Sequence, residues 1–147
     1  MRQVYVDSGA LVALLRPHDR AHRRMLAHFQ HLLEHRDVLV TTDIAVAEAA
    51  TQLRRDPGLH LVLAFRDALA RSVRGGGIRI LGSDDMLRQR AFSVMAAHPD
   101  IALTYGDCVA AALAGNKRVA AIVGLSPALR KLGYEVEPDE DTHNAGA

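Results

Sequence analysis

Short apolar runs alternate with longer amphipathic segments along this chain. The short runs are rich in Val, Ile and Leu, as is typical of buried strands; they cover residues 3–6, 37–41, 78–81 and 119–123, with an edge strand at 134–136. Between them apolar side chains recur at helical spacing, and the predicted helices cover residues 10–15, 20–35, 43–55, 59–73, 85–97, 104–113 and 127–132. This alternation predicts an α/β fold, a three-layer α/β/α sandwich around a mainly parallel central sheet.

The length of the chain fits one domain. At 147 residues the chain is long enough to bury a proper core, and we expect a single domain over residues 1–138. The segment 139–147 begins with Asp139 and Glu140 and contains no Lys or Arg. It is predicted to be an acidic, disordered C-terminal tail.

The composition excludes several classes of protein. Apolar residues make up 49% and charged residues 24%, an ordinary globular balance. No apolar run is long enough for a membrane span, and no leader resembles a signal peptide. The single cysteine, Cys108, excludes an internal disulfide and fits a reducing compartment, so we expect a cytoplasmic location. The net charge of +1 does not indicate a partner, but the acidic tail makes residues 1–138 more basic than the total, which permits a nucleic-acid partner.

Three acids occupy comparable places in the predicted strand–helix pattern. Asp7 directly follows the first strand, Glu48 lies in the alanine-rich third helix, and Asp107 opens the sixth helix. Ligands bind at the carboxyl edge of parallel sheets, and carboxylates that converge there can hold a divalent cation. Each acid also has an ordinary interpretation: Asp7 as a helix cap, Glu48 as a solvated side chain, and Asp107 as half of a capping box with Thr104. The functional interpretation therefore depends on the three acids lying together.

The same segments resemble the motifs of the PIN domain and, more narrowly, of VapC-type toxin ribonucleases. The run Val-Tyr-Val-Asp-Ser-Gly-Ala (4–10) resembles the family's first motif, residues 41–48 the second, Leu-Thr-Tyr-Gly-Asp-Cys (103–108) the third, and residues 133–136 the closing strand. The match runs in order over nearly the whole chain. It is therefore far more specific than any single motif.

The resemblance implies a chemistry and a set of partners. It implies that Asp7, Glu48 and Asp107 are the catalytic and metal-binding residues of an endoribonuclease, and that Mg²⁺ or Mn²⁺ activates a water for hydrolysis of RNA. Oxygen ligands suit these ions. It further implies that the protein is the toxin of a type II, VapBC-like toxin–antitoxin pair. A small antitoxin would then cover the acidic site, and the toxin would form a homodimer without a membrane partner.

The sequence departs from the family at one position. The family usually carries a further Asp just after the fourth strand, and here that position falls at Ser126. The neighbouring Gly124 and Leu125 have no side-chain ligand, and Ser126 offers at best a weak neutral contact. We therefore expect a three-acid site that cleaves RNA more slowly, or with a stronger need for Mn²⁺, than a four-acid relative. The alternative is a degenerate PIN domain that binds RNA or a protein partner with little or no cleavage.

An RNA substrate requires basic side chains on its approach surface. Most of the basic residues are expected to be ordinary solvated helix positions; the candidates are Arg16, Arg20, Arg23, Arg24, Arg54, Arg55, Arg71, Arg74, Lys117, Arg118, Arg130 and Lys131. With no Trp, three Tyr and three Phe, the sequence does not indicate an aromatic platform for bases.

Two histidine pairs and the cysteine have simpler interpretations. His18 and His22, and likewise His31 and His35, lie four residues apart, a spacing that also suits zinc. No third ligand is arranged with either pair, so solvated helix faces are favoured. Cys108 is expected to be a small buried residue and not a nucleophile.

Overall fold

Five parallel strands form the centre of the molecule. The computed structural model describes residues 1–140 of the 147. In this part of the chain the strands are β1 (Gln3–Val6), β2 (Val38–Thr42), β3 (Ile78–Leu81), β4 (Ala121–Val123) and β5 (Val136–Glu137). They pair in the order β3-β2-β1-β4-β5, and every pair is parallel. The prediction of a mainly parallel sheet is therefore confirmed.

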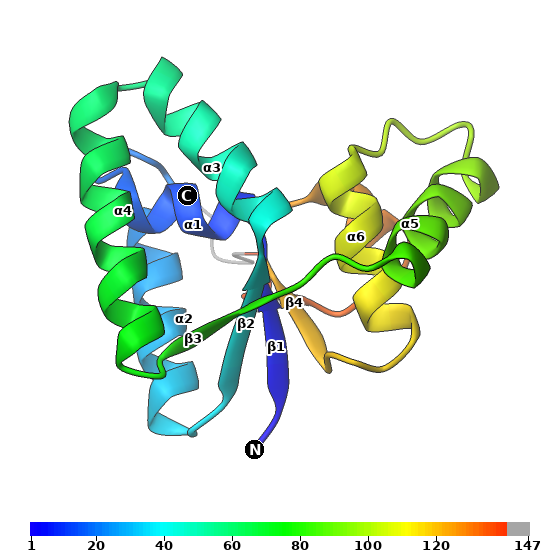
Figure 1. Ribbon diagram of the computed structural model, residues 1–147, viewed down its shortest axis with the longest axis horizontal. Coiled ribbons are helices and arrows are strands. Elements are labelled where there is room, and N and C mark those ends of the chain that lie inside the picture. Colours follow the sequence, from blue (N-terminus) through cyan, green and yellow to red (C-terminus); the bar gives the residue numbers. More distant parts are fainter. Residues whose placement is uncertain (141–147) are drawn as a thin grey trace, which may run out of the picture.

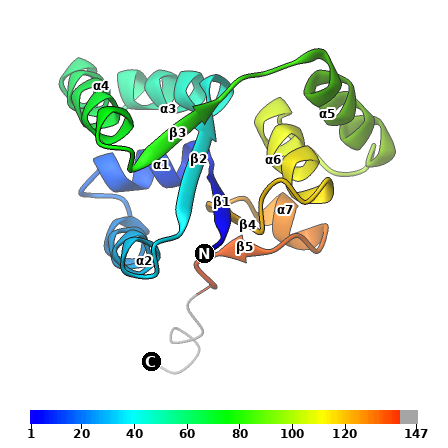
Figure 2. The same ribbon diagram turned by 60° about the horizontal axis from the view of Figure 1, so that its bottom comes forward.

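Helices cover the sheet on both sides. They are α1 (Ser8–Leu15), α2 (His22–Glu34), α3 (Asp43–Arg55), α4 (Leu59–Arg74), α5 (Asp85–Ala97), α6 (Tyr105–Gly115) and α7 (Pro127–Lys131). Figures 1 and 2 show α1–α4 on one side of the strands and α5–α7 on the other. The predicted three-layer α/β/α sandwich is the observed fold.

The core is deepest where β1 and β4 meet. Val4, Val6 and Ile122 have no exposed surface, and Tyr5 is only 1% exposed. Half of the buried residues of α6 are alanines, Ala110–Ala112. Small side chains let α6 pack close to the strands, so its first turn lies near the carboxyl ends of β1 and β4.

Polar side chains cap α1, α3 and α6 at their first turns. Asp7, Thr42 and Thr104 each accept a hydrogen bond from a backbone N–H in the first turn of the next helix, and Thr104 forms the predicted capping box with Asp107. These caps satisfy N–H groups that have no partner within the helix. The main departure lies at the last strand, which covers 136–137 and not 134–136, because Glu137 pairs with Val123.

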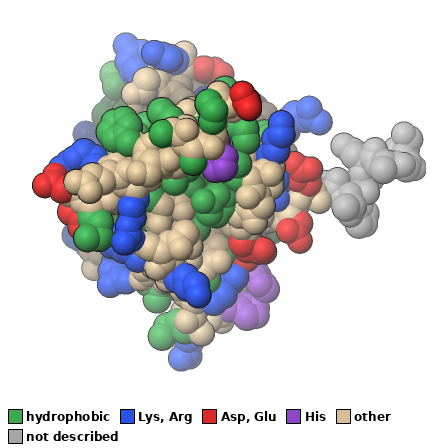
Figure 3. All heavy atoms as spheres, turned by 90° about the vertical axis from the view of Figure 1, so that its right-hand side faces the viewer, with side chains coloured by type: hydrophobic (Ala, Val, Ile, Leu, Met, Phe, Trp, Pro, Cys, Tyr) green, Lys and Arg blue, Asp and Glu red, His purple; other side chains and the backbone are tan. Residues whose placement is uncertain are grey.

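One side of the molecule exposes hydrophobic side chains. Figure 3 views the side formed by α5 and α6, where hydrophobic side chains gather in the middle and most Lys and Arg lie toward the rim. Among the exposed hydrophobic side chains, Met86 and Phe92 of α5 are 60% and 58% exposed.

No helix within residues 1–140 is long and apolar enough to cross a membrane. Of the predicted tail, residues 139–140 follow β5 outside any helix or strand, and 141–147 lie outside the described residues.

Candidate active site

The sheet order brings the predicted acids to one edge. β1 lies between β2 and β4, so the segments after these three strands are neighbours. Asp7 follows β1, Glu48 lies in α3 after β2, and Asp107 lies in the first turn of α6. These acids, together with Ser126 after β4, line one cavity of about 270 Å³. The structure thus brings together all four residues that the sequence indicated.

The rest of the cavity wall carries no positive side chain. It is made of hydroxyl, amide and small residues, and no Lys, Arg or His is among its described lining: Tyr5, Ser8, Gly9, Ala45, Gln52, Thr104, Gly106 and Leu125. Carboxylates that share a cavity without a basic partner repel one another. The negative charge of this site is therefore not offset by its described lining, and a bound cation would stabilise it.

Each carboxylate is oriented by a hydrogen bond from a neighbouring group. The N–H of Ala10 donates to Asp7 Oδ1 at 3.0 Å, and the Ser8 hydroxyl donates to Glu48 Oε2 at 2.9 Å. The N–H of Thr104 donates to Asp107 Oδ2 at 3.1 Å. Each of these bonds engages one carboxylate oxygen, and the backbone of Gly9 also donates to Asp7. The ordinary role of Asp7 and Asp107 as caps is therefore real, and it is compatible with a second role.

Asp7 is the acid most affected by its surroundings. Its pKa is raised from the ordinary 3.8 to about 7. Burial is the main cause, and the charges of Asp107 and Glu48 add to it, whereas hydrogen bonds from the backbone of Ala10 and Gly9 oppose it. Asp7 consequently favours its neutral form until a cation offsets the negative charge of the cavity.

Two glycines shape the site in a way that the sequence analysis missed. A Cβ atom at position 106 would lie 2.7 Å from Glu48 Oε2, closer than such atoms approach. A Cβ atom at position 124 would overlap with the carboxylate of Asp7. Gly106 and Gly124 therefore let the backbone of α6 and of the segment after β4 press against the two acids. The sequence signal was present, since each glycine lies within two residues of a position already selected.

Ser126 has a structural task at the fourth position. It is the N-cap of α7, and its hydroxyl accepts a hydrogen bond from the N–H of Leu129 at 3.3 Å. It lines the cavity but brings no charge to it. Gly124 excludes a larger side chain two residues earlier, so the segment after β4 contributes no acid to the cavity.

The donor set of the cavity fits a hard divalent cation. Its charged ligands are all carboxylates, and the hydroxyl and amide oxygens around them are also ligands that Mg²⁺ and Mn²⁺ accept. Within residues 1–140, however, no group of three His, Cys, Asp or Glu is spaced closely enough to hold a metal ion. The acids share a cavity without forming a closed cage, which suits an ion that keeps several waters.

The family is decided by a match across most of the chain. The PIN domain matches residues 4–123, a range that contains all three acids. This chain belongs to the PIN domain family. No curated protein sequence matches it closely enough to show a nearer relationship.

Solved structures agree with the PIN fold at low sequence identity. The structure of VapC20 from Mycobacterium tuberculosis, described as a sarcin-ricin loop cleaving toxin, has a TM-score of 0.72 at 17% identity, covering 89% of this chain and 95% of that chain. VapBC2 from Rickettsia felis, bound to a DNA fragment from its promoter, has a TM-score of 0.68 at 10% identity, with 92% and 97% covered. FitAcB from Neisseria gonorrhoeae has a TM-score of 0.59 at 16% identity, with 90% and 95% covered.

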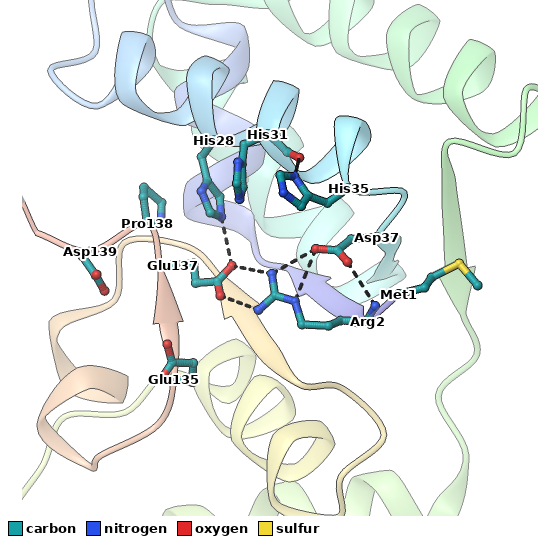
Figure 4. A pocket seen from close by; sticks show the side chains of 10 residues that line it. All are labelled: Met1, Arg2, His28, His31, His35, Asp37, Glu135, Glu137, Pro138 and Asp139. Atoms are coloured by element: carbon teal, nitrogen blue, oxygen red, sulfur yellow. Dashed lines mark hydrogen bonds and ion pairs between the residues drawn. The ribbon is translucent and has the colours of Figure 1, made fainter.

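A second, larger cavity of this PIN domain is not lined by Asp7, Glu48 or Asp107. Figure 4 shows this cavity of about 590 Å³, where Arg2 forms ion pairs with Asp37 at 3.0 Å and with Glu137 at 2.7 Å. His28 Nε2 lies 3.1 Å from Glu137, and His35 Nδ1 lies 2.8 Å from the carbonyl oxygen of His31. The network connects the residues just before β1 and β2 with β5 and α2. Its charged groups are already paired with one another, so we interpret it as structural.

Two of the proposed RNA-binding cations are also engaged within the PIN domain. Arg16 Nη2 donates to the carbonyl of Asp56 at 2.7 Å. Arg130 donates to the carbonyls of Val136 and Pro138 at 3.0 and 2.6 Å. These arginines fasten loops to the domain. Cys108 is buried as predicted, and burial together with the charge of Asp107 raises the pKa of its thiol, which disfavours a nucleophilic role.

Proposed function

We propose that this protein is a metal-dependent endoribonuclease, the toxin of a type II toxin–antitoxin pair of the VapBC kind. The observation that carries the proposal is the convergence of Asp7, Glu48 and Asp107 on one cavity without a basic residue in its described wall. Structural caps alone do not require Glu48 to meet Asp7, since Glu48 caps no helix. A shared cation explains why three repelling carboxylates are collected there.

The carboxylates would hold one Mg²⁺ or Mn²⁺, with Asp7 and Asp107 as ligands and Glu48 as a ligand or as an acceptor from a metal-bound water. When bound, such an ion activates a water and offsets negative charge at the phosphate. The protein's own contribution is orientation. Ser8 fixes the Glu48 carboxylate, and Thr104 fixes that of Asp107, so the acids need little rearrangement when substrate arrives.

The proposed substrate is RNA and the proposed partner is a small antitoxin. Both rest on the family resemblance, and the names VapBC2 and FitAcB of two similar structures are consistent with a partner. An acidic cavity at the surface attracts either a metal–phosphate complex or a cationic side chain of an inhibitor. We also propose that the toxin forms a homodimer, as the resemblance implies.

The direct test is cleavage of structured RNA by purified protein with Mg²⁺, with Mn²⁺ and with chelator. We expect cleavage that requires metal and falls at least 100-fold in Asp107→Asn. Asp84→Asn is the matched control, because Asp84 caps α5 as Asp107 helps to cap α6 but does not line the cavity. Cleavage that persists in chelator, or that survives Asp107→Asn, contradicts the proposal.

A second candidate is a PIN domain that binds RNA or protein without cutting it. It is favoured by one observation, the lack of an acid at Ser126 or at Gly124. RNA binding in chelator, measured by a filter or fluorescence assay, together with no cleavage in either metal, would support this candidate against the first.

A further inference from the structure

Tyr5 is a buried polar side chain that the proposed mechanism does not use. Its side chain is 1% exposed, and its hydroxyl lies 2.9 Å from Thr42 Oγ1. Tyr5 is nevertheless one of the residues that line the acidic cavity, although Thr42 is not. Tyr5 therefore lies where the buried core meets the site.

The hydrogen bonds around this pair leave one hydroxyl proton without an acceptor. Thr42 Oγ1 accepts from the N–H of Ala45 at 3.3 Å, and one hydroxyl proton lies between Thr42 and Tyr5. Two hydroxyls carry two protons, and within residues 1–140 neither hydroxyl donates to a further acceptor. A buried donor without an acceptor is costly. The second proton therefore needs a partner that is not a protein group.

The charges of the cavity decide which hydroxyl supplies that proton. Tyr5 lines the same cavity as the carboxylates of Asp7 and Glu48, whereas Thr42 does not. The same carboxylates draw the positive end of an O–H dipole toward themselves. The favoured arrangement is that Thr42 donates to Tyr5, and Tyr5 directs its own proton into the cavity.

The cavity has room for the missing acceptor. A water occupies about 30 Å³ of liquid volume, and the cavity of about 270 Å³ holds several. A water beside the Tyr5 hydroxyl would also lie among carboxylates that accept hydrogen bonds. It would thus have the polar partners that an ordered water requires.

We infer that Tyr5 is a positioning residue of this site, whose hydroxyl donates a hydrogen bond to a water held among the Asp7 and Glu48 carboxylates. The water is a ligand of the proposed metal ion, so Tyr5 acts from outside the set of direct ligands. Groups in such places orient the inner ligands, and their removal typically lowers metal affinity or activity by about 10- to 100-fold. The catalytic part of this inference rests on the proposed function, and the metal-binding part does not rest on RNA cleavage.

A purely structural role for Tyr5 makes a different prediction. In that case the Tyr5–Thr42 bond only fastens β1 to the start of α3, and breaking it from either end has the same effect on metal binding. Tyr5→Phe removes the hydroxyl and keeps the ring. Thr42→Val breaks the same bond from the other end and also removes the α3 cap, while Thr42→Ser keeps both interactions and serves as the matched control.

The experiment measures Mn²⁺ affinity by electron paramagnetic resonance, RNA cleavage at saturating metal, and thermal unfolding for the wild type and the three variants. We expect Tyr5→Phe to weaken Mn²⁺ binding and to lower kcat by about tenfold each, with KM for RNA within twofold. Thr42→Val should retain Mn²⁺ affinity within about threefold but unfold at a lower temperature, and Thr42→Ser should behave as the wild type.

Two results would overturn the inference. One is a Tyr5→Phe variant with the Mn²⁺ affinity and kcat of the wild type. The other is an equal loss of Mn²⁺ affinity in Tyr5→Phe and Thr42→Val, which a structural bond predicts. If the wild type cleaves no RNA, the proposed function fails, but the Mn²⁺ affinities of the variants still decide the role of Tyr5.

Discussion

Gly106 lies directly against the carboxylate of Glu48. The two residues come from different helices, α6 and α3, and a Cβ atom at 106 would lie 2.7 Å from Glu48 Oε2. This contact joins α3 to α6 beside Asp107, which is the next residue of α6. The position of Glu48 relative to Asp107 therefore depends on the absence of a side chain at 106.

A single methyl group at this position is expected to disrupt the site. Gly106→Ala should displace the Glu48 carboxylate and lower RNA cleavage by roughly 100-fold, since small misplacements of reacting groups have effects of this size. Gly115→Ala is the matched control: it lies at the other end of α6, and nothing lies within 4 Å of its added Cβ. Cleavage and circular dichroism of both variants give the answer. Equal activity of the two would mean that Glu48 has no role in cleavage.

The raised pKa of Asp7 predicts an unusual dependence of stability on pH. With a pKa of about 7 in the folded protein and an ordinary value of 3.8, Asp7 binds more protons in the folded than in the unfolded state between these values. The free energy of unfolding of the metal-free protein should therefore fall as pH rises from about 4 to 7. Asp7→Asn, which preserves an acceptor for Ala10, should remove this part of the dependence.

Thermal unfolding in chelator between pH 4 and 8 measures this effect. Asp84→Asn controls for the change of a capping carboxylate, because Asp84 also accepts from a first-turn N–H, that of Leu87 at 2.8 Å. Identical pH profiles for the wild type and Asp7→Asn would contradict the assignment of the raised pKa to Asp7.

A bound metal ion should offset the repulsion among Asp7, Glu48 and Asp107 and so stabilise the folded protein. At a Mn²⁺ concentration 100 times the dissociation constant, the wild type should gain about 2.7 kcal/mol of stability, which corresponds to roughly 5–10 °C in Tm for a domain of this size. Asp107→Asn should gain much less, because one charged ligand of the cavity is gone. Differential scanning fluorimetry with Mn²⁺ and with a matched concentration of K⁺ separates this effect from ionic strength. An equal gain of stability in the wild type and in Asp107→Asn would mean that the ion binds elsewhere.

Much of the site could be anticipated from the sequence because it follows local rules. Strand and helix patterns predicted the sheet, and a parallel sheet collects residues that follow adjacent strands, which accounts for Asp7 and Glu48. Asp107 lies in a helix that follows α5, and it joined the set through the resemblance of residues 103–108 to the family's third motif. The contacts of Tyr5 and Gly106 could not be found in this way. They depend on the distance between elements that are far apart in the sequence, and that distance is set by how closely alanine-rich helices pack.

Position 126 offers a gain-of-function test of the missing acid. Ser126→Asp adds a carboxylate to the cavity wall and keeps an oxygen that accepts from the N–H of Leu129, since Asp is also a good N-cap. We expect the Mg²⁺ concentration that gives half-maximal cleavage to fall by about three- to tenfold. Ser126→Ala, the control, loses the cap and about 1 kcal/mol of stability but should keep its metal dependence. No change in Ser126→Asp would mean that this wall does not face the bound ion.

The Arg2 network should support the fold without affecting the site. Asp37 and Glu137 are 6% and 14% exposed, so Arg2→Ala leaves two largely buried carboxylates without their main cation and should destabilise the domain by about 2–3 kcal/mol. Arg88→Ala is the control, because the pair of Arg88 with Asp85 is solvent-exposed and should contribute less than about 0.5 kcal/mol.

The same network predicts an opposite pH dependence to that of Asp7. Burial alone would raise the pKa of Asp37 and Glu137, but hydrogen bonds from Arg2 outweigh burial and hold both pKa values below their ordinary range. As pH falls, these two acids take up protons in the unfolded state before they do so in the folded state. The stability that they provide is therefore present above their unfolded pKa and is lost in acid. Urea unfolding at pH 7 and pH 3 should show that Arg2→Ala differs from the wild type more at pH 7 than at pH 3. A constant difference at both pH values would mean that Arg2 stabilises the fold by packing and not by charge.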